Sequence, residues 1–334
     1  MIGLTVGATL GGASVAPGAT SAALITAANL RVDAATAEVL RAFEAAGVQS
    51  ILLKGASVTR WLSTAESPRG YLDCDLLVRP ADLTAAERVL SELGFHPILD
   101  EREMPTWWRE HAMAWSRESD GASVDPHRTL VGVGVDPDQL WLTLAMHTEA
   151  LKVGKYDARA LTVPGRAFHL ALHAAQHGAI WSRVLLDLDS AVSAAGEETW
   201  AAAAVLAESL QATAAFAAGL RLIPSGRVLA DRLGLPADLP TDVAIRADTA
   251  PPVALGLDQL ARAKGLRARF AILWHKLVPP TTFMRHWSPQ ARRGRLGLVL
   301  AYLRRPFWLL ARLPTGFRAW WRARRSPGSG SRSS

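Results

Sequence analysis

Apolar and polar positions follow two different periods along the chain, and the change of period divides it into two parts. Before about residue 135, apolar runs bounded by glycine and proline predict strands over residues 50–57, 71–79, 111–118 and 121–127. Helical spacing predicts helices over residues 33–48, 56–62 and 83–93, with Asp33 as the first N-cap. From Asp138 to about Leu233 the pattern is helical and alanine-rich. We therefore expect an α+β protein, a mixed α/β domain followed by an α-helical domain.

Charge sets the last third of the chain apart. Residues 1–258 hold 30 acidic and 20 basic side chains, whereas residues 259–334 hold 17 basic and no acidic ones. This asymmetry predicts an anionic partner for the C-terminal region, either nucleic acid or a membrane surface. We expect an N-terminal extension at 1–30, the α/β domain at 31–135, the α-helical domain at 136–258, and a basic amphipathic C-terminal region at 259–334 with a disordered end.

Composition narrows the location of the protein. Hydrophobic residues make up 49% of the chain, enough for a large core, but no uncharged run of 18 residues is apolar throughout, so no membrane span is expected. The single cysteine, Cys74, cannot form an intrachain disulfide, which fits a reduced, cytoplasmic location. No basic residue precedes Arg31, so we expect a flexible extension or a start-site artefact there and not a signal peptide.

Two carboxylates interrupt the apolar run YLDCDLLVR at residues 71–79. Strand alternation puts Leu72, Cys74, Leu76 and Val78 on a core face, and Asp73, Asp75 and Leu77 on the other. Neighbouring like charges raise each other's pKa, a cost that a hard divalent cation removes. The alternative is a solvated sheet edge with two incidental aspartates.

Further residues are candidates for the same site. If the strand that holds Asp125 lies beside the acidic strand, three carboxylates converge and form a cage for Mg²⁺ (or Mn²⁺) with an NTP, or Asp125 acts as general base. Lys54, Gly55 and Ser57 lie at a strand–helix turn suited to phosphate, and Arg69 precedes the acidic strand. An ordinary turn and a surface arginine are the alternatives.

Histidines mark the predicted helical domain. His169, His173 and His177 recur every four residues and share one helix stripe, which favours packing against the α/β domain with His177 in a pocket, or else a Zn²⁺ site. Arg183 and Asp187 either form a helix ion pair or leave Arg183 to reach a phosphate or the acceptor. His127 shares the face of Asp125, where it orients a carboxylate, assists proton transfer, or is a plain surface histidine.

The order of these pieces resembles the uncharacterised nucleotidyltransferase family, within the broad polymerase-β-like nucleotidyltransferase superfamily. The resemblance spans residues 30–235 and rests on these stretches: Leu52-Leu53-Lys54-Gly55, Arg69, Asp73-Cys74-Asp75-Leu76-Leu77-Val78, Leu93-Gly94-Phe95, Val124-Asp125-Pro126-His127, and His177 with Arg183 and Asp187. It implies a nucleotidyltransferase fold and metal-dependent transfer of an NMP group from an NTP to an unknown acceptor.

By this resemblance Asp73 and Asp75 hold the metal, Asp125 is the third acid, and residues 55–57 form the phosphate loop. Two departures bear on activity: Ala56 follows Gly55 where relatives have serine, and Pro126 is expected to distort its strand. Two alternatives stay open. One is a non-catalytic pseudoenzyme that binds nucleotide or peptide, and the other is a toxin-like transferase that acts on tRNA or protein.

Arginines alternate with Leu, Trp and Phe from Arg285 to Arg325. This pattern fits an amphipathic helix at an anionic membrane, RNA binding, or packing of the apolar half against the body. Because apolar residues outnumber the arginines, peripheral membrane contact or packing is favoured over nucleic acid.

Overall fold

The computed structural model describes residues 17–63, 68–99, 111–248 and 251–325. Its strands are β1 (Ser50–Leu52), β2 (Cys74–Val78), β3 (His96–Pro97), β4 (Trp115–Ser116), β5 (Ser123–His127), β6 (Thr148–Val153) and β7 (Tyr156–Leu161). Its helices are α1 (Pro17–Ala45), α2 (Ala56–Leu62), α3 (Leu83–Glu92), α4 (Pro137–Ala145), α5 (Val163–His177), α6 (Ser182–Ala194), α7 (Glu197–Ser209), α8 (Thr213–Leu220), α9 (Pro224–Arg232), α10 (Thr241–Asp248), α11 (Pro252–Arg262), α12 (Leu266–Leu277), α13 (Thr281–Trp287) and α14 (Gly294–Arg325).

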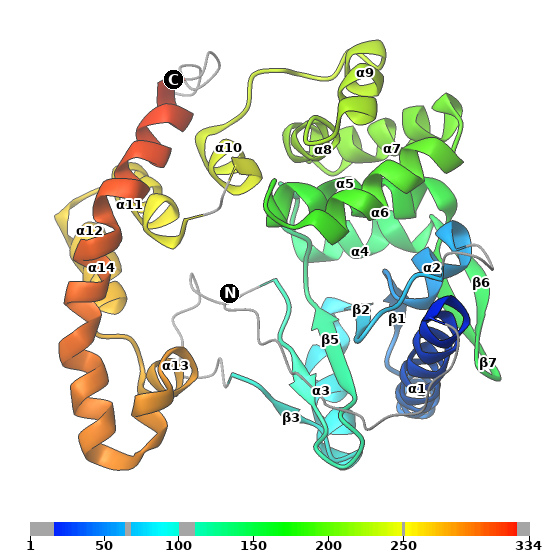
Figure 1. Ribbon diagram of the computed structural model, residues 1–334, viewed down its shortest axis with the longest axis horizontal. Coiled ribbons are helices and arrows are strands. Elements are labelled where there is room, and N and C mark those ends of the chain that lie inside the picture. The colour runs from blue at the N-terminus through cyan, green and yellow to red at the C-terminus, as the bar shows by residue number, and fades with distance from the viewer. Residues whose placement is uncertain (1–16, 64–67, 100–110, 249–250, 326–334) are drawn as a thin grey trace.

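Within the described residues, seven strands form one mixed sheet in the order β3-β4-β5-β2-β1-β7-β6. The acidic strand β2 is central, antiparallel to β1 and parallel to β5. Apolar side chains cover both of its faces: Cys74, Leu76 and Val78 join a core with α1 and α3, and Leu77 joins a second core with α4 and α5. The alternative of a solvated sheet edge is therefore wrong. Figure 1 shows α4 to α9 gathered on one side of the sheet.

Several predicted elements match the structure. Helix α2 has the predicted bounds, α3 ends one residue before the predicted end, and β2 and β5 lie inside the predicted strands. Pro126 does not break β5, whose register with β2 runs without interruption from Cys74↔Val124 to Leu77↔His127. The expected distortion of this strand is wrong.

Other expectations are corrected. Helix α1 begins at Pro17, so Asp33 lies inside it and is not an N-cap, and residues 17–30 are not a flexible extension. Leu72 precedes β2 and is 75% exposed, so it does not belong to the core face. The predicted disordered end and residues 1–16 lie outside the described residues.

The largest difference between the predicted and the observed elements is the hairpin of β6 and β7, because a continuous helical pattern is expected there. Strand β7 pairs in parallel with β1 through Leu52↔Ala160, so the sheet extends beyond residue 135. Leucine, alanine, lysine and glutamate are good helix formers, and tertiary pairing overrides their preference here. Helices α5 to α14 then follow, as expected for the second part.

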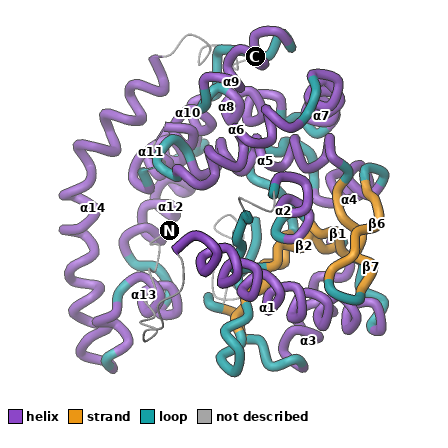
Figure 2. Tube along the Cα trace, turned by 45° about the vertical axis from the view of Figure 1, so that its right-hand side comes forward, coloured by secondary structure: helices purple, strands orange, loops and turns teal. Residues whose placement is uncertain are grey.

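The C-terminal helices form a separate flank. Helix α14 runs along one side of the molecule, away from the sheet, and packs on α10 and α11. Figure 2 shows the same arrangement from a second direction. In the part of the chain that the structure describes, no helix is both long and apolar enough to cross a membrane.

Candidate functional site

Three carboxylates meet where β2 and β5 lie side by side. Asp75 on β2 and Asp125 on β5 are register partners, and Asp73 immediately precedes β2. One oxygen from each of the three lies within 4.8 Å of the others. Asp75 is buried, whereas Asp73 and Asp125 are partly exposed, so the group opens toward solvent on one side.

The electrostatics of this group are unfavourable when all three carboxylates are charged. Burial, together with the charges of Asp75 and Asp73, raises the pKa of Asp125 to about 7. Burial and the neighbouring Asp75 also raise the pKa of Asp73. The site therefore favours either a proton or a bound cation.

Asp75 is held in its charged form by two side chains. The Lys54 ammonium lies 3.2 Å from one carboxylate oxygen, and Nε2 of His127 lies at 3.0 Å, in hydrogen-bonding contact, from the other. Burial raises the pKa of Asp75, but Lys54 and the His127 hydrogen bond outweigh it and lower the pKa below its usual value. Since His127 is buried against Asp75, it is not a plain surface histidine.

Lys54 is tied to the acidic group in return. Burial disfavours its ammonium, but the charges of Asp75, Asp73 and Asp125 outweigh that effect and raise its pKa. Lys54 thus stays charged beside the carboxylates, in a position to neutralise part of their charge.

The turn after Lys54 packs on the loop that leads to Asp73. Gly55 has φ of 69°, and a Cβ there would lie 3.3 Å from the Asp73 carbonyl oxygen, so glycine permits both the conformation and the close approach. Ser57 is fully buried and its hydroxyl donates to the Leu53 carbonyl. The structure therefore does not present Ser57 to a phosphate, and the prediction for this residue is not supported.

Arg69 and Asp187 join the loop before β2 to helix α6. The Arg69 guanidinium donates to both Asp187 oxygens at 2.7 Å and to Thr59 at 3.0 Å. Arg183 donates to the Gly70 carbonyl of the same loop. Asp187 thus pairs with Arg69 and not with Arg183, and three of the five Arg69 donors hold protein atoms, which favours a positioning role over phosphate contact.

The histidine stripe of α5 lies beside this site. Burial lowers the pKa of His169 to about 3 and that of His177 to about 4, so both are neutral near pH 7. Among the described residues, the acidic trio is the only group of three or more ligating atoms close enough to share an ion. The Zn²⁺ alternative for the stripe is therefore not supported.

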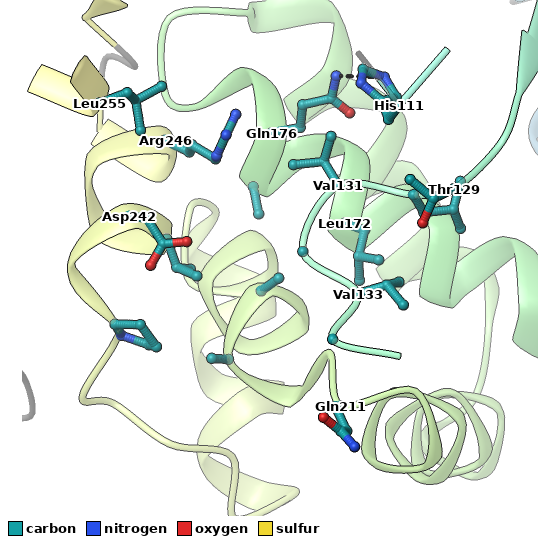
Figure 3. Close-up of a pocket in the computed structure, with 18 of the residues that line it drawn as sticks. His111, Thr129, Val131, Val133, Leu172, Gln176, Gln211, Asp242, Arg246 and Leu255 are labelled. Carbon is teal, nitrogen blue, oxygen red and sulfur yellow. Dashed lines mark hydrogen bonds between the residues drawn. The ribbon is translucent and has the colours of Figure 1, made fainter. Parts of the chain in front are cut away.

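A cavity of about 1000 Å³ (Figure 3) is lined in part by His177, the last residue of this stripe. Residues 128–134, which directly follow β5, line it together with α5, α8, α10 and α11. At one end His111 and Gln176 are hydrogen-bonded at 3.1 Å, and the His111 ring lies 5.4 Å from that of His127. Sequence reasoning placed His177 in a pocket but missed His111 and Gln176, because neither stands in a motif with the acids.

Paired carboxylates at the start of a central strand and a third on the neighbouring strand are the arrangement expected of a nucleotidyltransferase. A sequence model of the family described as "Uncharacterised nucleotidyltransferase" matches residues 19–225. The chain therefore belongs to this family, which places it among the transferase enzymes. The match covers α1 through the start of α9 and leaves the C-terminal flank outside.

Two solved structures are similar over part of the chain. The antibiotic-resistance factor ANT(2'')-Ia is 12% identical, with 58% of this chain and 92% of that chain covered and a TM-score of 0.36. An antigenic nucleotidyltransferase-like protein from Paracoccidioides brasiliensis is 13% identical, with 55% and 93% covered and a TM-score of 0.33. No curated protein matches the chain.

Proposed function

We propose that the protein transfers an NMP group from an NTP to an acceptor, and that Asp73, Asp75 and Asp125 hold the divalent cation this reaction needs. The observation that carries the proposal is the convergence of three carboxylate oxygens within 4.8 Å. Oxygen donors are the ligands that Mg²⁺ and Mn²⁺ prefer. Buried Oδ1 of Asp125 has no hydrogen-bond partner within the described residues, as expected of an atom reserved for a ligand.

The chain's own residues prepare the site. When bound, the cation neutralises the carboxylates and polarises phosphoryl oxygens. Lys54 and His127 fix both oxygens of Asp75, and Gly55 brings the backbone close to the Asp73 loop. The acceptor oxygen forms a bond to the α-phosphorus as the bond to pyrophosphate breaks. The proton of the acceptor hydroxyl passes to a general base. In the alternative assignment of Asp125, its carboxylate is that base and not a ligand of the cation.

The cavity of Figure 3 is the place where we propose that the acceptor binds. Arg128, which lines the cavity, lies three residues after Asp125 in the sequence, and three residues of extended chain span about 10 Å. The cavity lining holds more basic than acidic side chains: Arg128, Arg246, Arg262 and Lys276 against Asp242, which pairs with Arg262. We therefore favour an acceptor that carries a negative group, selected by the helical part of the chain.

Thermal stability with and without NTP and Mg²⁺ tests the proposal. The wild type is expected to be stabilised only when both are present, and Asp73→Ala to abolish the effect. Asp238→Ala, which removes an exposed acid from the loop between α9 and α10, is the matched control. Equal stabilisation of Asp73→Ala and wild type would contradict the proposal.

The two alternatives give different results. A pseudoenzyme would show stabilisation without release of pyrophosphate when labelled NTPs and a cell extract are supplied. A toxin-like transferase would arrest growth on expression, and Asp75→Ala would relieve the arrest. A cytoplasmic location stays a prediction from the single cysteine.

A further inference from the structure

Helix α14 carries its large apolar side chains on the outside. Exposed apolar residues recur every three or four positions along its length, with Pro314 in the same line. They are at least 43% exposed and form what we call the outer stripe: Leu296, Leu300, Leu303, Phe307, Leu310, Phe317 and Trp321. This spacing places them on one face of the helix over roughly 38 Å.

The opposite face of α14, which packs on the protein, consists mostly of small residues. The buried positions are Ala301, Arg305, Gly316, Ala319 and Ala323. A Cβ on Gly316 would lie 2.7 Å from Val253 of α11, so the two helices approach closely there. A helix that only packs on its own core buries the large side chains and exposes polar ones. The reversed order in α14 indicates that a partner covers the outer stripe.

Helix α12 adds a second exposed stripe to the same flank. The helix has no buried residue, and Leu266, Phe270 and Trp274 are all more than half exposed. An apolar groove of about 310 Å³ lies between α11, α12 and α14, and Leu273 of α12 and Leu310 of the outer stripe both line it. Exposed apolar patches of this kind mark binding surfaces.

Charge identifies the kind of partner. Residues 259–325 contain 16 lysines and arginines and no acidic residue. Exposed arginines such as Arg304, Arg318 and Arg322 stand on α14 with the stripe. Two copies of this basic flank would repel each other, which disfavours docking of a second copy through the same flank. An anionic surface, in contrast, is attracted to it.

We propose that the flank of α12 and α14 docks on an anionic lipid surface, with α14 lying in the plane of the interface. Leucine, phenylalanine and tryptophan side chains enter the boundary of the acyl chains while arginines contact lipid phosphates. Arg312 over Trp308 and Arg325 over Trp321, at 4.1 and 4.6 Å from the ring centroids, fit such an interface. The exposed apolar stripe favours lipid over RNA, whose backbone offers charge but no apolar interior. The proposal is independent of the proposed nucleotidyl transfer.

Co-sedimentation of the full chain with phosphatidylglycerol vesicles and with phosphatidylcholine vesicles tests it. We expect binding to the anionic vesicles only, weakened by added salt. Leu300→Glu with Phe307→Glu should lower the affinity at least about tenfold, and each of Arg304→Ser and Arg318→Ser about fivefold. Val205→Glu, at a residue of α7 that is 67% exposed, is the matched control and should bind as the wild type. Unchanged melting temperatures show that each variant folds.

Three results would overturn the proposal. One is absence of binding to anionic vesicles. A second is vesicle binding that the arginine variants weaken but the stripe variant leaves intact, which would make the flank a general polyanion site, with RNA homopolymer binding as its confirmation. A third is a wild-type dimer in light scattering that the stripe variant converts to monomer, which would identify a second copy as the occupant.

Discussion

The body of this protein, from α1 to α10, and its C-terminal flank treat burial in opposite ways. The body buries large side chains such as Phe168, Trp200 and Phe216, and concentrates its unfavourable charges at one point between β2 and β5. The flank buries alanine and glycine along α14 and exposes the large side chains over its whole length. The difference teaches that a buried cluster of charge indicates a site for a small ligand, whereas an inverted helix face indicates a surface for an extended one.

The largest expected effect separates the two regions by stability. Phe216→Ala removes a fully buried ring and should lower the free energy of unfolding by about 4 kcal/mol. Phe307→Ala, at a side chain that is 72% exposed, should change it by less than about 1 kcal/mol. Urea denaturation measures both. Similar losses for the two variants would mean that the outer stripe is covered by the protein itself.

The acidic site gives the next largest effect. Asp75→Asn leaves Lys54 buried without its main counter-charge and should cost about 3 kcal/mol of unfolding free energy. Asp157→Asn breaks the exposed pair with Lys152 and is the control, expected to cost at most about 1 kcal/mol. Equal, small losses would show that the Lys54–Asp75 pair is well solvated.

The clamp between Arg69 and Asp187 should be worth less. Its two short hydrogen bonds join the loop before Asp73 to α6, and Asp187→Ala should cost about 2 kcal/mol. A double-mutant cycle with Arg69→Met isolates the coupling. A coupling free energy near zero would refute the positioning role assigned to this pair.

The pH dependence of cation binding is the smallest effect. Because the pKa of Asp125 is raised to about 7, its carboxyl carries a proton below that pH, and the proton must leave before a cation binds. The affinity for Mg²⁺ should therefore fall by up to about tenfold per pH unit below about pH 7 and level off above it. Titration calorimetry across this range measures it. An Mg²⁺ affinity that does not change with pH would show that Asp125 does not bind the cation.

Much of the body could be predicted from local pattern. The bounds of α2 and the strand character of β2 follow from punctuation by glycine and proline, and alternation put Asp73 and Asp75 on the same side. The sequence predicted that Asp125 lies near Asp73 and Asp75 only if its strand is the neighbour of theirs, because no local pattern says which strands are neighbours. The structure supplies that order through Asp75↔Asp125.

Other features depend on tertiary contacts that no short window contains. The hairpin of β6 and β7 has the residues of a helix but pairs with β1 far earlier in the chain. Asp187 has an arginine four residues before it, yet it binds Arg69, which is 118 residues away. His111 lines the cavity and contacts Gln176 on α5, which is 65 residues away. Basic and apolar residues of the flank were visible in sequence, but which of them face outward was not.

Divalent cation binding by the wild type and by Asp125→Ala tests the central claim most directly, with Asp238→Ala as control. Mn²⁺ titrated calorimetrically should bind to the wild type and to the control with equal affinity. Asp125→Ala should weaken binding by more than about 100-fold. Loss of a residue that only supports a metal ligand weakens metal binding by at most about 100-fold, so a larger loss indicates that Asp125 is itself a ligand. Binding of Mn²⁺ to Asp125→Ala with wild-type affinity would contradict the account, because the third carboxylate would then have no part in holding the cation.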